Sequence, residues 1–221
     1  MLGEILPAAV ATVELYEDPP ESWLYPEEEA YVSRAVESRR REFTTGRHCA
    51  RAALARLGVP ATAILKGERG APCWPDGVVG SITHCAGYRA AAVARTADLV
   101  TVGIDAEPNE PLPAGILDTV SLPEERGRLT GLADALPEIA WDRLLFSAKE
   151  SVYKAWFPLT GSWLGFEEAD ITVDPATNSF RARLLVPGPT VAGTEWYGFT
   201  GRYGVSDGLV VTAVTEGLRR T

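Results

Sequence analysis

Carboxylates are the side chains of this sequence that most directly point to chemistry. Asp105 and Glu107 come at the end of an apolar run, residues 99–105, that alternates like a β-strand. Side chains two apart on a strand point to the same face, so these two negative charges would repel each other. Mg²⁺ is commonly held by one or two carboxylates together with substrate phosphates, and it would remove that repulsion. The alternative is a solvated strand end.

A third carboxylate, Glu150, lies in a predicted helix four residues before Lys154. Side chains at this spacing share a helix face, and the simplest interpretation is an ordinary ion pair worth about 0.3–0.5 kcal/mol. His84 follows a predicted strand over residues 78–83 and is one of only 2 histidines. A single histidine is more often structural than catalytic, and we interpret the other one, His48, as structural.

Charge is distributed unevenly along the chain. The 221 residues carry a net charge of −9, yet residues 34–56 hold seven arginines against two glutamates, after a segment 1–33 with eight acidic residues and no basic one. Lys66 and Arg69 follow closely. One basic island in an acidic protein favours a compact anionic ligand over nucleic acid. A solvated helix face is the alternative for such a run of charge.

Two long helices are predicted from the spacing of apolar residues. The first helical pattern runs from Pro26 to Gly58, with a break expected at residues 44–46. The second runs from about residue 137 to 157 and is expected to end at Pro158. Between them, Ser121 and Glu124 have the spacing of a helix capping box.

Strand patterns complete the expected architecture. Residues 90–95 and 99–105 are expected to form a hairpin through residues 96–98. Later strands are expected at residues 170–173, 180–186, 197–203 and 209–215. A long helix therefore precedes a closing hairpin twice, the hairpins being residues 88–105 and 198–215. This repetition favours two small α/β units with a cleft between them.

Three motifs occur in order along the chain. They are residues 81–84 (Ser-Ile-Thr-His), 102–107 (Val-Gly-Ile-Asp-Ala-Glu) and 146–154 (Phe-Ser-Ala-Lys-Glu-Ser-Val-Tyr-Lys). Together they resemble the motifs of the Sfp-type 4′-phosphopantetheinyl transferases. Gly46 with Arg47, and residues 66–72, resemble two accessory motifs. The resemblance spans residues 39–165, and residues 74–87 are most similar to the actinobacterial members of that family.

The resemblance implies an α/β (α+β) fold of two pseudo-symmetric halves, each a small antiparallel sheet packed with helices, with the active site in the cleft between them. Residues 1–100 would grip the phosphates of coenzyme A, and residues 101–221 would carry the metal and catalytic motifs. The implied reaction transfers the 4′-phosphopantetheine arm of coenzyme A to a serine of apo acyl or peptidyl carrier proteins and releases adenosine 3′,5′-bisphosphate. Fatty-acid, polyketide and non-ribosomal-peptide carriers all remain open.

The resemblance also implies roles for individual residues. Asp105, Glu107 and Glu150 would hold Mg²⁺ against the diphosphate, with Glu150 either completing the metal site or acting as the base toward the carrier serine. Lys154 and His84 would contact phosphate, and backbone groups of Thr83 would lie beside the nucleotide. The remaining coenzyme A contacts would come from Arg39, Arg47, Lys66 and Arg69, from Gly67, Glu68 and Gly70 in a close-lying loop, and from Leu164.

Two other functions compete with the transferase. Three acids also build metal-dependent phosphohydrolases that act on coenzyme A or another nucleotide, and a basic pocket alone would suit a non-catalytic coenzyme A-binding protein. The absence of a second ligand cluster argues against the hydrolase. The presence of all three acids argues against the binding protein.

The cellular location, the state of the cysteines and the oligomeric state are also predicted from the sequence. No run of about 18 apolar residues and no signal-peptide pattern occurs, so we expect a cytoplasmic protein without a membrane partner. The 3 cysteines, at positions 49, 73 and 85, match neither a disulfide framework nor a zinc pattern. We expect a monomer, because two fused halves already form a complete cleft.

Overall fold

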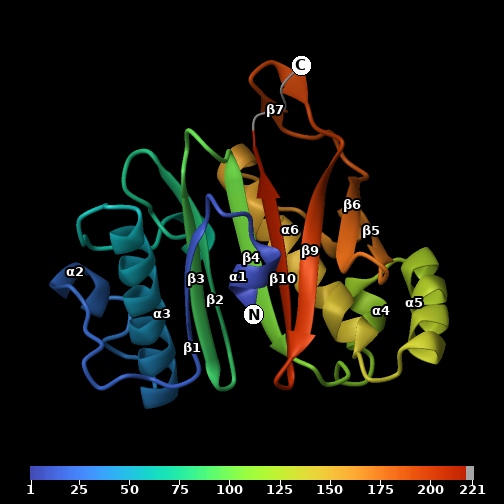
Figure 1. Ribbon diagram of the computed structural model, residues 1–221, viewed down its shortest axis with the longest axis horizontal. Coiled ribbons are helices and arrows are strands. Elements are labelled where there is room, and N and C mark those ends of the chain that lie inside the picture. Colours follow the sequence, from blue (N-terminus) through green and yellow to red (C-terminus); the bar gives the residue numbers. More distant parts are fainter. Residues whose placement is uncertain (218–221) are drawn as a thin grey trace.

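The computed structural model describes residues 1–217 and is built around two antiparallel sheets, each with a long helix beside it (Figure 1). The first part of the chain forms α1 (Leu2–Ile5), β1 (Ala11–Leu15), α2 (Pro26–Glu29), α3 (Glu37–Arg56), the 3₁₀ turn η1 (Glu68–Gly70), β2 (Val78–Cys85) and β3 (Tyr88–Arg95). The second part forms β4 (Thr101–Pro108), α4 (Ile116–Val120), α5 (Pro123–Ala135), α6 (Trp141–Thr160), the 3₁₀ turn η2 (Phe166–Glu168), β5 (Ala169–Asp174), β6 (Ser179–Leu184), β7 (Thr190–Val191), β8 (Thr194–Glu195), β9 (Gly198–Ser206) and β10 (Leu209–Glu216).

The two main sheets repeat one topology. The first has the strand order β1-β3-β2, and the second begins β4-β10-β9 before continuing to β6 and β5. In each half the first strand pairs with the last strand of a hairpin, β2–β3 or β9–β10, and a 20-residue helix lies between them in the chain. Helix α3 packs on the first sheet and α6 on the second. The predicted fold of two similar α/β halves is confirmed.

The halves meet where β2 lies beside β4 (Figure 1). Side chains of β2 make the hydrogen bonds along this contact: the backbone N–H of Ile104 donates to Ser81 Oγ at 3.1 Å, and that of Ala106 to Thr83 Oγ1 at 3.0 Å. Small hydroxyl residues let the two strands approach while satisfying buried N–H groups. This contact brings the first two sequence motifs together, with Thr83 beside Asp105.

Helix α6 forms the centre of the second core. Its residues Leu144, Leu145, Val152 and Trp156 are buried against the second sheet, as their spacing predicts. At the other end of the chain, α1 contacts β9 and β10 of the second sheet and also β1 of the first, so the first residues pack against both halves. The division of roles at residue 100 stays a prediction.

The expected hairpin of residues 90–95 and 99–105 is wrong. Strand β3 is central in its sheet, paired on one side with β1 and on the other with β2, so both of its edges are occupied. The chain therefore leaves after Arg95 and enters the second sheet, where β4 pairs with β10. The hairpin that corresponds to β9–β10 is β2–β3.

The bounds of the helices also differ from expectation. The first helical run breaks at residues 30–36, and residues 44–46 lie inside α3, where Thr44 Oγ1 donates to the carbonyl oxygen of Arg40 at 2.8 Å. Pro158 lies inside α6, which continues to Thr160 and ends at Gly161 with φ 64°. Helix α6 begins only at Trp141.

The capping box is shifted by one residue from its expected place. Glu125 Oε2, not Glu124, accepts a backbone N–H at the start of α5, and the donor is Leu122 at 2.7 Å. Ser121 is occupied elsewhere, since its hydroxyl donates to the carbonyl oxygen of Leu117 at 2.5 Å. Among the described residues, no helix combines the length and apolar character needed to cross a membrane.

Candidate active site

A pocket of about 410 Å³ lies between the two halves. The first half contributes Arg69 and Ile82 to its lining, and the second contributes Glu150, Tyr153 and Lys154 from α6. Residues from two of the predicted motifs therefore face one pocket, although they are about 70 positions apart in the sequence.

Asp105 is the most deeply placed acid of the site. It is 5% exposed, and its Oδ1 accepts hydrogen bonds from Lys154 Nζ at 2.7 Å and Thr83 Oγ1 at 3.3 Å. Its Oδ2 is buried and has no hydrogen-bond partner among residues 1–217. A buried carboxylate oxygen without a donor is costly, so this atom is suited to accept a cation or a ligand donor.

Glu107 and Glu150 lie close enough to Asp105 to be affected by its charge. Burial, and then the charge of Asp105, raise the pKa of Glu107, against the lowering effect of Arg143, whose guanidinium lies 2.9 Å from Glu107 Oε2. Burial raises the pKa of Glu150; Lys154 lowers it, whereas Asp105 and Glu107 raise it further. Arg143 is a residue that the sequence motifs did not single out.

These three acids fit a hard divalent cation by their chemistry but are not drawn together as ligands. Within the described part of the chain, no three His, Cys, Asp or Glu side chains converge tightly enough to hold a metal ion. Lys154 and Arg143 instead supply the positive charge, one to Asp105 and one to Glu107. The donors that Mg²⁺ prefers are nevertheless present, including the unpartnered Asp105 Oδ2.

Lys154 does not form the helical ion pair that its spacing from Glu150 suggests. Its ammonium crosses to strand β4, where it donates to Asp105 Oδ1 and to the carbonyl oxygen of Ile104 at 3.1 Å. An ion pair between two elements, rather than along one helix, fixes the distance between α6 and β4. Lys154 therefore links α6 to β4 and also lines the pocket.

A second, smaller pocket of about 120 Å³ adjoins the first and is lined by cations. The lining includes the cations Arg39, Arg47 and Lys66, the imidazole of His84 and one acid, Glu42, which lies 3.3 Å from Arg39 NH1 and 3.7 Å from His84 Nδ1. Arg39 NH1 lies 2.8 Å from His84 Nε2. Burial lowers the pKa of Lys66, and the charges of Arg39 and Arg47 lower it further. Burial is also the main cause of the lowered pKa of His84. Three cations, Arg39, Arg47 and Lys66, against one acid leave this pocket with a net positive charge, so it is suited to bind an anion.

Arg47 is the buried member of this group. It is 5% exposed, its Nε donates to the carbonyl oxygen of Ile64 at 2.7 Å, and its guanidinium carbon lies 4.3 Å from the centre of the Phe43 ring. Burial lowers its pKa to about 10, which leaves it charged at neutral pH. Of the three adjacent arginines, Arg39 lines this pocket, whereas Arg40 and Arg41 line a different groove.

The loop after Lys66 is held by its own backbone. The N–H of Gly67 donates to the carbonyl oxygen of Ala71 at 2.8 Å, and Gly70, with φ 81°, lines both pockets. Glu68 is exposed at the tip. Arg69 turns toward the second half, where its guanidinium carbon lies 5.5 Å from the centre of the Trp163 ring.

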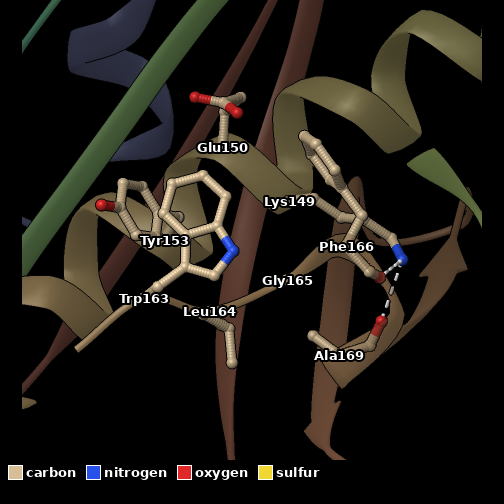
Figure 2. A pocket seen from close by; sticks show the side chains of 8 residues that line it. All are labelled: Lys149, Glu150, Tyr153, Trp163, Leu164, Gly165, Phe166 and Ala169. Carbon is tan, nitrogen blue, oxygen red and sulfur yellow. Dashed lines mark hydrogen bonds between the residues drawn. The ribbon is translucent and has the colours of Figure 1, made fainter. Parts of the chain in front are cut away.

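Figure 2 shows the wall of the cleft that continues from α6. Leu164 is buried here, as part of a narrow pocket lined also by Lys149, Glu150, Tyr153 and Trp163. The Tyr153 and Trp163 rings lie 4.9 Å apart between centres, and Trp163 is 55% exposed. The family resemblance indicates Leu164 but not this aromatic pair, which an exposed tryptophan shortly after the helix that carries Glu150 could have suggested.

Comparisons with known proteins show the family of this chain. Residues 27–94 match the family model of the 4′-phosphopantetheinyl transferase N-terminal domain, and residues 101–205 match that of the 4′-phosphopantetheinyl transferase superfamily. The chain belongs to the 4′-phosphopantetheinyl transferases. Its activity is the transfer of 4′-phosphopantetheine from coenzyme A to carrier proteins. The predicted family and function are thereby confirmed, and the hydrolase and the non-catalytic binding protein are disfavoured.

Named relatives support the actinobacterial character of this transferase. The chain is 58% identical to 4′-phosphopantetheinyl transferase Svp of Streptomyces mobaraensis, over 97% of this chain and 88% of the relative. It is 51% identical to PptT of Mycobacterium tuberculosis, over 97% of each, and 53% identical to Npt of Nocardia iowensis, over 97% of this chain and 99% of the relative.

Proposed function

We propose that this transferase depends on Mg²⁺. The wall of the cleft formed by the first half would bind the phosphates of coenzyme A, and the wall formed by the second half would hold the metal and the base. The observation that carries the proposal is the buried Asp105 Oδ2, which has no hydrogen-bond partner within residues 1–217 and lies in a site with two further carboxylates. The cation-lined pocket of the first half adjoins the same cleft. A diphosphate would thus meet cations of the protein on one side and carboxylates suited to a metal on the other.

Asp105, Glu107 and Glu150 are the residues that would hold the metal. Mg²⁺ would supply positive charge to the diphosphate and to the leaving phosphate, where negative charge grows during transfer. Lys154 and Arg143 now balance Asp105 and Glu107. With those carboxylates engaged by a metal, Lys154 would be free to contact a phosphate oxygen, as the family resemblance implies.

The cation-lined pocket would hold the phosphates of coenzyme A. Arg47 is fixed by its bond to Ile64 and by the Phe43 ring, so little conformational freedom is lost when it grips an anion. Burial lowers the pKa of His84, and a bound phosphate would raise that pKa and strengthen the contact. Lys66 and Arg39 would complete the grip. Leu164 would line the arm's path.

Glu150 is the residue proposed to take the proton. The serine oxygen of the carrier attacks the phosphorus that bears the pantetheine arm, and the bond from that phosphorus to the oxygen of adenosine 3′,5′-bisphosphate breaks. The hydroxyl proton passes to the Glu150 carboxylate. Because its pKa is raised toward neutral pH, this carboxylate is a better base than an ordinary glutamate.

The partners are apo acyl or peptidyl carrier proteins, and we propose that the protein works as a monomer in the cytoplasm. One chain supplies both walls of the cleft, so a second copy adds nothing to it. The cysteines Cys49, Cys73 and Cys85 are all free, which suits a reducing compartment.

One assay tests the proposal. The protein is incubated with an apo carrier protein, coenzyme A and Mg²⁺, and the carrier is read by intact-protein mass, with a matched sample in which a chelator removes the metal. We expect a gain of the phosphopantetheine mass that disappears with the chelator. Transfer that continues unchanged in the chelated sample would contradict the metal dependence. Loss of nucleotide without modification of the carrier would indicate a hydrolase.

A further inference from the structure

A buried glutamate bridges several elements in the first half. Glu28 is 0% exposed and is the third residue of α2. Its Oε2 accepts from the backbone N–H of Tyr25 at 2.9 Å, and its Oε1 from that of Ile64 at 2.8 Å. Arg51 NH1 donates to both oxygens, at 3.1 and 2.9 Å. We call Glu28 with Arg51 the first clamp.

The second half contains the same arrangement. Glu125 is 1% exposed and is the third residue of α5. Its Oε2 accepts from the backbone N–H of Leu122 at 2.7 Å and lies 2.8 Å from Lys149 Nζ, and its Oε1 accepts from the backbone N–H of Ile171 at 2.7 Å. We call Glu125 with Lys149 the second clamp.

The two clamps correspond element by element. Each glutamate follows a helix-initiating proline, Pro26 or Pro123, and each helix precedes the 20-residue helix of its half. Each carboxylate pairs with a cation of that long helix and accepts an N–H from the segment that comes after it. A buried carboxylate is tolerated only when charge and donors satisfy it, so the geometry of each clamp is strongly determined.

The first clamp ends at the cation-lined wall of the cleft. Ile64 is held at both polar backbone atoms, its N–H by Glu28 and its carbonyl oxygen by Arg47 Nε at 2.7 Å. Lys66 follows only two residues later. The first clamp therefore fixes two of the groups that line the proposed phosphate site. Arg47 is held through the carbonyl oxygen of Ile64 and lies with its Nε 3.9 Å from Glu28 Oε1, and Lys66 is held through the backbone.

The second clamp ends at the other wall. Lys149 is 4% exposed, and its ammonium also donates to the carbonyl oxygens of Phe166 and Ala169, at 2.5 and 2.9 Å (Figure 2). These bonds hold the segment that carries Leu164 against α6, and Lys149 directly precedes Glu150 in that helix. The second clamp therefore fixes the wall beside the proposed base.

We propose that Glu28 and Glu125 are matched positioning residues of the transferase, Glu28 for coenzyme A affinity and Glu125 for turnover. The inference rests on the proposed function, since it needs the phosphates on one wall and the base on the other. A merely structural role would lower the amount of folded enzyme and leave the kinetic constants of the folded fraction unchanged.

The test shortens each glutamate by one methylene while keeping its charge, in Glu28→Asp and Glu125→Asp. A misplacement of the wall by a fraction of an ångström to about 1 Å is expected to cost about tenfold to a hundredfold in the affected constant. For Glu28→Asp we expect KM for coenzyme A to rise with kcat little changed. For Glu125→Asp we expect kcat to fall with KM for coenzyme A little changed.

The chain offers a matched control for each variant. Glu27 and Glu124 are the exposed residues directly before Glu28 and Glu125, and Glu27→Asp and Glu124→Asp should behave like the wild type. If an aspartate variant does not fold, the cation of the same clamp is changed instead, in Arg51→Lys or Lys149→Arg, with the same split expected. Melting temperatures confirm that folded protein is compared.

The outcomes separate this inference from the proposed function. Wild-type protein that does not modify the carrier would contradict the proposed function itself and the inference with it. Active wild-type protein whose folded clamp variants keep both constants, or change both together in each variant, would overturn only the inference. A rise in KM alone for Glu28→Asp, together with a fall in kcat alone for Glu125→Asp, would support it.

Discussion

Helix α3 and the segment around Lys66 present cations to the cleft, whereas α6 and strand β4 present carboxylates from the other side. The first wall carries Arg47 and Lys66, and the second carries Asp105 and Glu150. Both walls are built on the same frame, since the strand order β1-β3-β2 is repeated as β4-β10-β9. The shared strand topology therefore sets where the side chains of the two walls meet, and the charge of those side chains determines whether a wall binds an anion or a cation.

The buried charges show the same division. Cations that crowd one pocket are stabilised by an anion, and carboxylates that crowd another are stabilised by a cation. The charge of each wall is only partly compensated within the protein: burial and neighbouring cations lower the pKa of Lys66, and burial together with the charge of Asp105 raises the pKa of Glu107. Bound coenzyme A would reduce the repulsion among the cations of the first wall, and a bound metal would reduce the repulsion among the carboxylates of the second wall.

The largest expected effect comes from removing one charge of the acidic wall. Asp105→Asn keeps the size of the side chain but cannot hold a metal as a carboxylate does, so we expect carrier modification to fall by at least about a hundredfold. The melting temperature should show that the fold is retained. Turnover at the wild-type rate in ordinary Mg²⁺, read by carrier mass, would remove Asp105 from the site.

A smaller effect is expected on the cationic wall. Losing one charge-assisted contact costs about 1.5–3 kcal/mol, so Arg47→Met should raise the dissociation constant of coenzyme A about tenfold to a hundredfold in calorimetry. The affinity of the wild-type protein should also fall as salt rises, because Arg39 is exposed and Lys66 half-buried, so their charges are screened. Arg56→Met, on an exposed position of the same helix, is the control. Equal losses at both positions would mean a diffuse field instead of a pocket.

The smallest effect concerns stability. Because the pKa of Glu150 is raised in the fold, its protonated form is favoured there, and the charged form lowers stability once the pH exceeds that pKa. Glu150→Gln should therefore melt higher than wild type at pH 8 and nearly equally at pH 4. A gain of about 1 kcal/mol corresponds to about 2–4 °C for a protein of this size. A lower melting temperature of the variant at pH 8 would show that the Glu150 charge is stabilising.

Local sequence patterns predicted the elements that are amphipathic and missed those set by long-range pairing. Residues Leu144, Leu145, Val152 and Trp156 show the core face of α6 directly, because burial there follows helical spacing. Local sequence patterns do not show which strand pairs with β4. Strands 90–95 and 99–105 are neighbours in sequence, and only the occupied edges of β3 exclude their pairing.

The site was predictable to the extent that motifs carry it. Asp105, Glu150, Lys154 and His84 all stand out by type and position, yet the contact between Lys154 and Asp105 depends on the distance between α6 and β4, which no local pattern contains. Glu28 is the middle of three consecutive glutamates, residues 27–29, and no local pattern marks it as buried. Its burial follows from Arg51 and Ile64, which lie 23 and 36 residues away.

The central claim, that the two walls have separate tasks, is tested most directly by comparing Arg47→Met and Asp105→Asn side by side. Coenzyme A affinity is measured without metal, and carrier modification is measured with Mg²⁺ at saturating coenzyme A. We expect Arg47→Met to bind weakly yet to turn over within about a fewfold of wild type once saturated. We expect Asp105→Asn to bind coenzyme A like the wild type and to transfer almost nothing. Joint loss of affinity and saturated turnover in both variants would contradict the account.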